Sequence, residues 1–484
     1  MSAELTIRVL LIGIISLMIA LSVSGYVRET GPEPTEEGKQ KYGPLLLGYT
    51  LPLFFLLFFI TGPALFGIAL TFKIALSVCF GVSLHIGLYY VVLIMVLPFF
   101  RKHINARACA VFWLLPNYLY FILWYSDMKI SKPLLVIHAS KRLVTILFAV
   151  WLLGCLAVLS WNIIRHLLFR RKILSHSVPV TDSGVLQSFH AALEETAFHK
   201  PKLQLVMTDD VSTPLTVGLY QRSTKIVLPR KNYSPDELHL IFRHELIHIS
   251  RADSWTKFFM MFCTAMCWFN PLMWLAMKKS AEDVELSCDE TVLLGADEST
   301  RNQYANLILS AAGDDRGFST CLSATAASMR YRLKTIMKPQ KRRTGALAIG
   351  FTCFVLYMTC GYVSLVYGDD TGAATIFRGS DPDEFVVYSI TTTDGTYIHS
   401  MDEIDTEALT RYIADLVTQE MTGDYSYSDE QYLSVDYHNS PYGIVFVQLG
   451  TEFIKVRYLD DEDTGWYVYH LQEPTDWSAV SLFL

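Results

Sequence analysis

The chain has 484 residues, of which 51% are hydrophobic and only 18% charged. Soluble proteins carry about a quarter charged residues, so the composition excludes an ordinary soluble protein, and the length allows several domains. The net charge of −7 is unevenly spread, because residues 369–484 hold 23 acidic and four basic side chains, or −19, which leaves +12 for the rest. The nine cysteines include no CxxC pair, which argues against a cysteine-type zinc finger.

Residues 1–164 are predicted to form a membrane domain, because their apolar runs approach the ~20 residues that a helix needs to cross a bilayer. The first run follows Arg8 and is interpreted as a retained helix, although a cleaved signal peptide stays open. About five membrane helices are expected, at 9–25, 45–70, 75–100, 108–125 and 143–164. A further apolar run at 346–367 predicts the last one.

Basic residues flank the segment 165–345, which is therefore expected on the cytoplasmic side by the positive-inside rule. "RHLLFRRK" closes the fifth run, and "KPQKRRTG" precedes the last one. The acidic tail, residues 368–484, is then extracytoplasmic, and its alternating strands with one helix near 405–419 predict a small α+β domain. The predicted fold is a multi-pass α-helical membrane protein with a cytoplasmic α+β zincin metallopeptidase domain and a small extracytoplasmic α+β domain.

The zincin assignment begins with the stretch "IFRHELIHISRAD", which contains a His-Glu-x-x-His spacing. Ser234-Pro235-Asp236-Glu237 predicts the start of a helix, with a capping serine and a capping box. His244 and His248 then share one helical face and can bind one Zn²⁺ ion, while Glu245 can act as general base on water. The alternative is a solvated polar face of an ordinary helix.

A third metal ligand is expected downstream, in "AEDVELSCDETVL". Glu285 is the predicted carboxylate ligand, and Asp289, four residues later, is expected to orient a ligand imidazole. Glu282 and Asp283 compete with Glu285 for the ligand role, and Cys288 is interpreted as a small packed residue.

The apolar stretch between these motifs cannot cross the bilayer if both motifs hold one ion. Asn270-Pro271 breaks the stretch into two helices, each about as long as a buried core helix. We therefore expect a hydrophobic helical hairpin that folds back toward the site.

Together, "HELIHISRAD", "FNPLMW", "ELSCDETVL" and the upstream "STPLTVGLYQRSTKIVLP" resemble the BlaR/MecR-type family of membrane zinc metallopeptidases. The resemblance covers about 75–340. It implies His244, His248 and Glu285 as zinc ligands and Glu245 as the base. It also implies an antirepressor that responds to an outside signal by cleaving itself, a cytoplasmic transcriptional repressor, or both.

The tail departs from the family, because it lacks the Ser-x-x-Lys motif of the usual penicillin-binding sensor. Its only lysine is Lys455, and Glu452 stands where the serine would be. The partners expected are therefore a protein substrate, the lipid membrane and an unknown extracytoplasmic ligand, without direct contact to nucleic acid; a homodimer stays open.

Two further residues receive weaker expectations. Tyr304 is a candidate for stabilising the oxyanion or for helix packing, and Asp253 is expected to orient Arg251 or a backbone group rather than to touch the metal. Two other functions stay open from the sequence: a signalling scaffold with an inactive site, and a transporter. The basic segment 328–337 is interpreted either as a self-cleavage region or as an anchor to anionic lipid.

Overall fold

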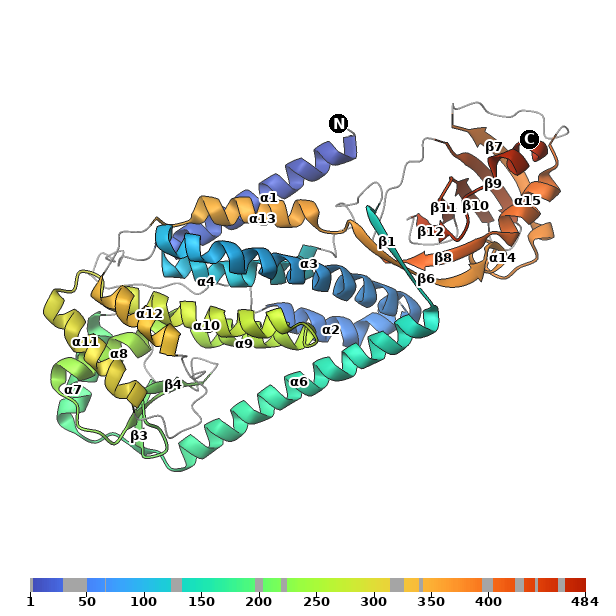
Figure 1. The fold of residues 1–484 in the computed structure, drawn as a ribbon. Coiled ribbons are helices and arrows are strands. Elements are labelled where there is room, and N and C mark those ends of the chain that lie inside the picture. The colour runs from blue at the N-terminus through green and yellow to red at the C-terminus, as the bar shows by residue number, and fades with distance from the viewer. Residues whose placement is uncertain are drawn as a thin grey trace.

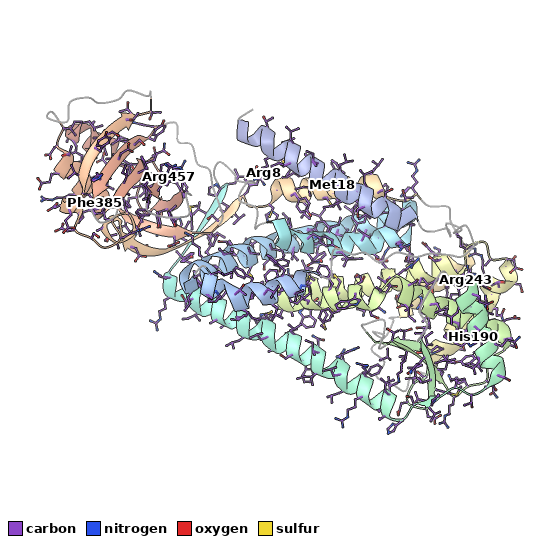
Figure 2. The ribbon with its side chains drawn as sticks, turned by 180° about the vertical axis from the view of Figure 1, so that it is seen from behind. Arg8, Met18, His190, Arg243, Phe385 and Arg457 are labelled. Atoms are coloured by element: carbon purple, nitrogen blue, oxygen red, sulfur yellow. The ribbon has the colours of Figure 1, made fainter. Side chains whose placement is uncertain are left out.

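The computed structural model shows an elongated helical bundle with a mixed α/β lobe at one end and a β-rich tail at the other (Figure 1). It describes residues 3–28, 50–65, 67–122, 133–195, 203–218, 224–313, 326–338, 343–393, 404–422, 431–439, 443–459 and 466–484. Figure 2 shows the separation of the two ends, with His190 and Arg243 in the lobe and Phe385 and Arg457 in the tail.

The bundle is built from apolar helices that share one core. Its elements are α1 (Ala3–Arg28), α2 (Thr50–Leu65), α3 (Gly67–His103), α4 (Ala106–Leu114), a 3-10 turn (Leu115–Tyr118), α5 (Leu119–Ile122), α6 (Lys141–Ser175) and α13 (Ala346–Thr359). Two segments, Thr71–His103 and Lys141–Ser175, are long and apolar enough to cross a membrane by length and composition. Shorter apolar helices lie at Arg8–Ser24, Pro52–Leu65 and Ala346–Thr359.

Two of the predicted helices differ from those observed. The run 108–125 is divided by the 3-10 turn, which has Pro116 near its start and so lacks one backbone donor. The last helix was expected to reach residue 367, but α13 ends at Thr359, and Val363–Thr371 forms strand β6. Gly361, with a φ of +93°, makes the turn between the two elements, and β-branched valines follow it.

The stretch between the two metal-site motifs is a helical hairpin, as predicted. Helix α9 (Asp253–Met266) and helix α10 (Pro271–Val292) are separated by a short turn in which Asn270 caps α10. The tip of the hairpin packs inside the bundle. The Trp151 indole of α6 donates to the carbonyl of Met266 at 2.7 Å, and the Trp268 indole donates to the carbonyl of Trp151 at 3.2 Å.

This packing predicts that a methyl group at Gly154 destabilises the protein. A Cβ at Gly154 would lie 2.2 Å from Cε2 of Trp268, so the hairpin tip or α6 would have to shift. Overpacking of this kind costs about 1–3 kcal/mol. We expect Gly154→Ala to lower the thermal unfolding temperature in detergent micelles. Gly13→Ala is the control, because a Cβ there meets nothing within 4 Å, and an equal loss in both variants would contradict the prediction.

The lobe that carries the metal-site motifs holds a four-stranded sheet in the order β2-β3-β5-β4. Its elements are β2 (Val178–Pro179), α7 (Ser183–Glu195), β3 (Gln204–Thr208), β4 (Leu215–Val217), β5 (Lys225–Pro229), α8 (Pro235–Ser250), α11 (Glu298–Gly313) and α12 (Ala326–Met337). Helix α8 packs on the sheet through Phe242 and Leu246, which contact a core containing Phe189 and Ile226. Among the described strands, β4 is at the edge nearest the functional motifs.

The tail forms an eight-stranded sheet in the order β1-β6-β8-β12-β11-β10-β9-β7. Its elements are β6, α14 (Gly372–Thr375), a 3-10 turn (Pro382–Glu384), β7 (Val386–Thr392), α15 (Thr406–Asp415), β8 (Val417–Met421), β9 (Leu433–Asn439), β10 (Gly443–Leu449), β11 (Phe453–Tyr458), β12 (Tyr467–Leu471) and α16 (Trp477–Phe483). The first strand, β1 (Leu135–Ala139), comes from the loop before α6 and pairs in parallel with β6. The tail is therefore joined to the bundle by a shared sheet.

Candidate metal centre

Helix α8 begins as the sequence predicts and presents two histidines on one face. The Ser234 side chain accepts from the backbone N–H of Glu237 at 3.3 Å, and Glu237 accepts from the N–H of Ser234 at 2.8 Å. This capping box fixes the first turn, and two to four turns later His244 and His248 emerge side by side, with their Nε2 atoms 3.0 Å apart.

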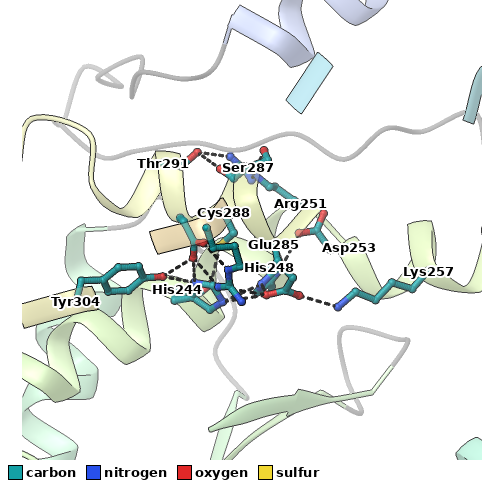
Figure 3. A network of polar contacts seen from close by, with 12 residues as sticks. His244, His248, Arg251, Asp253, Lys257, Glu285, Ser287, Cys288, Thr291 and Tyr304 are labelled. Atoms are coloured by element: carbon teal, nitrogen blue, oxygen red, sulfur yellow. Dashed lines mark hydrogen bonds and ion pairs between the residues drawn. The ribbon is translucent and has the colours of Figure 1, made fainter. Parts of the chain in front are cut away.

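Glu285 of α10 reaches the same point. Its Oε2 atom lies 3.6 Å from the Nε2 atom of each histidine (Figure 3). Ligand atoms at 2.0–2.2 Å from a tetrahedral Zn²⁺ ion are separated by roughly 3.3–3.6 Å, close to the spacing of these three atoms. The α9–α10 hairpin makes this meeting possible, because it returns the chain from α8 to the site.

Asp253 lies behind His248 and fixes its tautomer. The Nδ1 atom of His248 is 2.7 Å from Oδ2 of Asp253, and a carboxylate only accepts, so Nδ1 carries the proton. Ala252, with a φ of +54°, makes the sharp turn between α8 and α9 that brings Asp253 back toward the ring. The expected partner of Asp253 was Arg251 or a backbone group. The structure instead brings Asp253 to His248, while Arg251 donates to Ser287 and Thr291.

Tyr304 and Asp289 lie behind His244. The Tyr304 hydroxyl donates to Oδ1 of Asp289 at 2.8 Å, and its oxygen lies 2.8 Å from Nδ1 of His244. The ring therefore donates to the tyrosine, since the hydroxyl proton is already committed to the carboxylate. This placement differs from the oxyanion role considered for Tyr304, because the hydroxyl contacts the Nδ1 side of the ring and not the Nε2 side. Asp289 supports His244 through Tyr304, with a direct Nδ1–Oδ1 separation of 3.8 Å.

These contacts test whether the residues fit a metal ion. Both Nδ1 protons are directed at acceptors behind the rings, so both Nε2 atoms present lone pairs to each other at 3.0 Å. Lone pairs at this distance repel unless a cation lies beside them. Together with the Glu285 carboxylate they form a His₂Glu donor set, which is one of the sets found in catalytic zinc sites.

Neighbouring groups also set the charges of Glu285 and His244. Burial would raise the pKa of Glu285, but Lys257, 3.1 Å from Oε1, and His248 hold it well below its usual range. Burial would lower the pKa of His244, but Cys288 and Glu285 outweigh it and raise that pKa to about 10. The site thus keeps its carboxylate ionised and favours a cation, a proton or a metal ion, at the facing Nε2 atoms.

Cys288 belongs to the same cluster, since its Sγ atom and the nitrogens of His244 and His248 all lie within 4.8 Å of one another. Burial raises the pKa of the thiol, but His244 and His248 lower it to about 7. The thiol also contacts the His244 carbonyl at 3.5 Å. The Oε2 atom of Glu285, by comparison, is equidistant from the two Nε2 atoms, at 3.6 Å from each.

Glu245 is buried beside the histidines and has a partner that the sequence did not reveal. The Thr216 hydroxyl of edge strand β4 donates to Oε2 of Glu245 at 2.6 Å. Thr216 lies within the motif "STPLTVGLYQRSTKIVLP", but the motif alone does not show which residue faces the helix. Its hydroxyl binds one of the two carboxylate oxygens of Glu245.

Asp283 and Glu282, the other candidates for the third ligand, have partners away from the two histidines. Asp283 is buried and accepts from Arg101 of α3 at 2.7 Å and from the Trp113 indole of α4 at 2.8 Å. Glu282 pairs with Lys279 on its own helix at 2.7 Å. Asp283 therefore anchors α10 to the bundle and is not part of the ligand set.

Comparison with known proteins matches the part of the chain that contains this site. Residues 121–336 match the family model described as BlaR1 peptidase M56. The regulatory protein BlaR1 of Bacillus licheniformis is 30% identical over 211 residues, which are 43% of this chain and 34% of that protein. The methicillin resistance mecR1 proteins of Staphylococcus aureus and Staphylococcus epidermidis are each 22% identical over 174 residues, 35% of this chain and 29% of theirs.

The matched residues include the lobe and the candidate site. Residues 121–336 therefore resemble the peptidase part of the BlaR/MecR-type proteins. The chain spans about a third of the length of the curated relatives that it matches.

Proposed function

We propose that this protein is a zinc metalloendopeptidase in which His244, His248 and Glu285 hold the ion. The observation that carries the proposal is the convergence of both Nε2 lone pairs and the Glu285 carboxylate, while both Nδ1 protons are bound behind the rings. Bound there, Zn²⁺ would supply Lewis-acid chemistry to a water molecule and to a peptide carbonyl.

The protein's own residues account for the proton transfers. Glu245 takes a proton from the attacking water on its free carboxylate oxygen and passes it to the leaving amine. Thr216 holds the other oxygen, so the carboxylate keeps one orientation through both steps. Edge strand β4 carries Thr216, and an extended peptide paired with β4 would lie next to Glu245 with little demand on its sequence.

We further propose that the peptidase lobe is cytoplasmic and the tail extracytoplasmic in a multi-pass membrane protein. The basic segments at 165–172 and 338–343 support this orientation, and the acidic tail lies at the opposite end of the bundle (Figure 1). The tail also contacts the bundle directly, through the pairing of β1 with β6 and an ion pair of 2.6 Å between Lys73 and Glu420. A signal bound by the tail would thus act on helices that reach the peptidase lobe.

The proposed substrate is a cytoplasmic repressor, the protein itself, or both. This proposal rests on the match to the BlaR1 peptidase family and on the name of the Bacillus relative, regulatory protein BlaR1.

Zinc content of the purified full-length protein tests the metal site. We expect close to one zinc per chain in the wild type and its loss in His248→Ala, because two remaining ligands make a poor site. His190→Ala, which removes an exposed histidine from the same lobe, should keep the zinc. A wild type without zinc would favour a signalling scaffold with an inactive site.

A further inference from the structure

Helix α12 brings an arginine to the candidate metal centre. The Nε and Nη2 atoms of Arg332 donate to Oδ2 and Oδ1 of Asp289, at 2.8 and 2.9 Å. Its Nη2 atom is also 4.0 Å from Oε2 of Glu285, and the side chain is only 15% exposed. From sequence, this basic helix read as a cleavage region or a lipid anchor, whereas one of its charges lies inside the site.

The two hydrogen bonds from Arg332 fix the orientation of the Asp289 carboxylate. The Asp289 side chain is 1% exposed, and a carboxylate so buried needs a cation and several hydrogen bonds. A guanidinium that grips both oxygens fixes the plane of the carboxylate, which a lysine cannot do. The fixed Oδ1 atom then receives the Tyr304 hydroxyl, and the Tyr304 oxygen receives Nδ1 of His244.

We propose that Arg332 is a positioning residue of the metal centre: through Asp289 and Tyr304 it sets the direction in which His244 presents its Nε2 atom. This inference rests on the proposed function, since it concerns the same ligands. Helix α12, which precedes the last bundle helix, would then help to position a metal ligand.

A second contact ties the neighbouring residue of α12 to the same ligand helix. The guanidinium of Arg101 lies 5.6 Å from the centre of the Tyr331 ring and also pairs with Asp283 of α10. Asp283 and Asp289 stand on either side of Glu285 in α10. Both carboxylates that anchor this part of α10 are thus bound by groups on α12 or in contact with it, so a shift of α12 would disturb the ligand set.

The test measures zinc affinity of the full-length protein in detergent micelles, by competition with a chelator. We expect Arg332→Gln to weaken zinc binding by about 10–100-fold, the usual effect of removing a residue that supports a metal ligand. Arg332→Lys keeps the charge without the fork and should show an intermediate loss. Arg330→Gln is the matched control, because Arg330 is exposed on the same helix.

Rescue distinguishes positioning from a general structural effect. Methylguanidinium added to Arg332→Ala should restore zinc affinity in part, and it should not restore His248→Ala. Wild-type affinity in Arg332→Gln, or the same loss in Arg330→Gln, would overturn the inference while leaving the proposed function intact. If Arg332→Gln does not fold, the Arg332→Lys variant becomes the test. Wild-type zinc affinity in Arg332→Lys would also overturn the inference. A wild type that binds no zinc overturns the proposed function and this inference with it.

Discussion

Replacing Glu245 with glutamine is expected to lower peptide hydrolysis by about 10²–10⁴-fold, the usual contribution of a general base. Glutamine has nearly the same shape and can still accept the hydrogen bond that Thr216 donates at 2.6 Å. Its amide cannot take a proton from water, so proton transfer is lost while the site stays assembled. Zinc content should therefore match that of the wild type, because Glu245 is not among the proposed ligands.

The measurement is the rate at which new protein N-termini appear in cells that produce either version of the chain. Fragments seen with the wild type and absent with Glu245→Gln identify the substrate and the cleaved bond, including any cleavage of the protein itself. Glu298→Gln, an exposed substitution at the start of α11, is the control and should leave the fragments unchanged. Unchanged fragments in Glu245→Gln with full zinc content would show that this carboxylate is not the base.

Much of the candidate site could be predicted from local sequence. The helix start at Ser234, the four-residue spacing of His244 and His248, and the break at Asn270-Pro271 each follow from rules that act over a few residues. Placing Glu285 with the histidines needed one additional step, the argument that two motifs sharing an ion cannot be separated by a membrane crossing.

The supporting residues could not be predicted in the same way, because their contacts join elements far apart in the chain. Thr216 and Arg332 look like ordinary strand and helix residues until β4 and α12 are packed against α8 and α10. The contact of Asp253 with His248 depends on the sharp turn at Ala252. Alanine rarely adopts a left-handed conformation, so the sequence "SRAD" does not predict this turn.

The end of helix α13 could not be predicted from sequence for a different reason. Hydropathy alone does not distinguish the last turns of an apolar helix from a buried apolar strand, so residues 346–367 read as one span. The shared sheet explains the true boundary, because β6 pairs with β1 on one side and β8 on the other. β1 has only five residues, and its pairing with β6 is not evident from the local sequence.

The buried carboxylate of Asp283 leads to the second large expected effect. Asp283→Ala removes the acceptor of the Trp113 indole hydrogen bond and the carboxylate partner of Arg101, at a site where the Asp283 residue is buried. Breaking one side of a buried ion pair costs about 3–5 kcal/mol, because the remaining charge stays without compensation. Unfolding in mixed micelles should show this loss, and zinc binding should weaken with it, since α10 also carries Glu285.

A double substitution separates the ion pair from the packing. Replacing both partners with apolar residues, Asp283→Leu with Arg101→Met, should recover much of the stability that either single change loses, because no charge is then left buried alone. Glu282→Ala is the matched control on the adjacent residue, and its ion pair with Lys279 within one helix should contribute no more than about 0.5 kcal/mol. If Asp283→Ala and Glu282→Ala cost the same, Asp283 does not anchor α10. If the double variant regains stability without zinc affinity, the pair is needed to place Glu285 rather than to hold the fold.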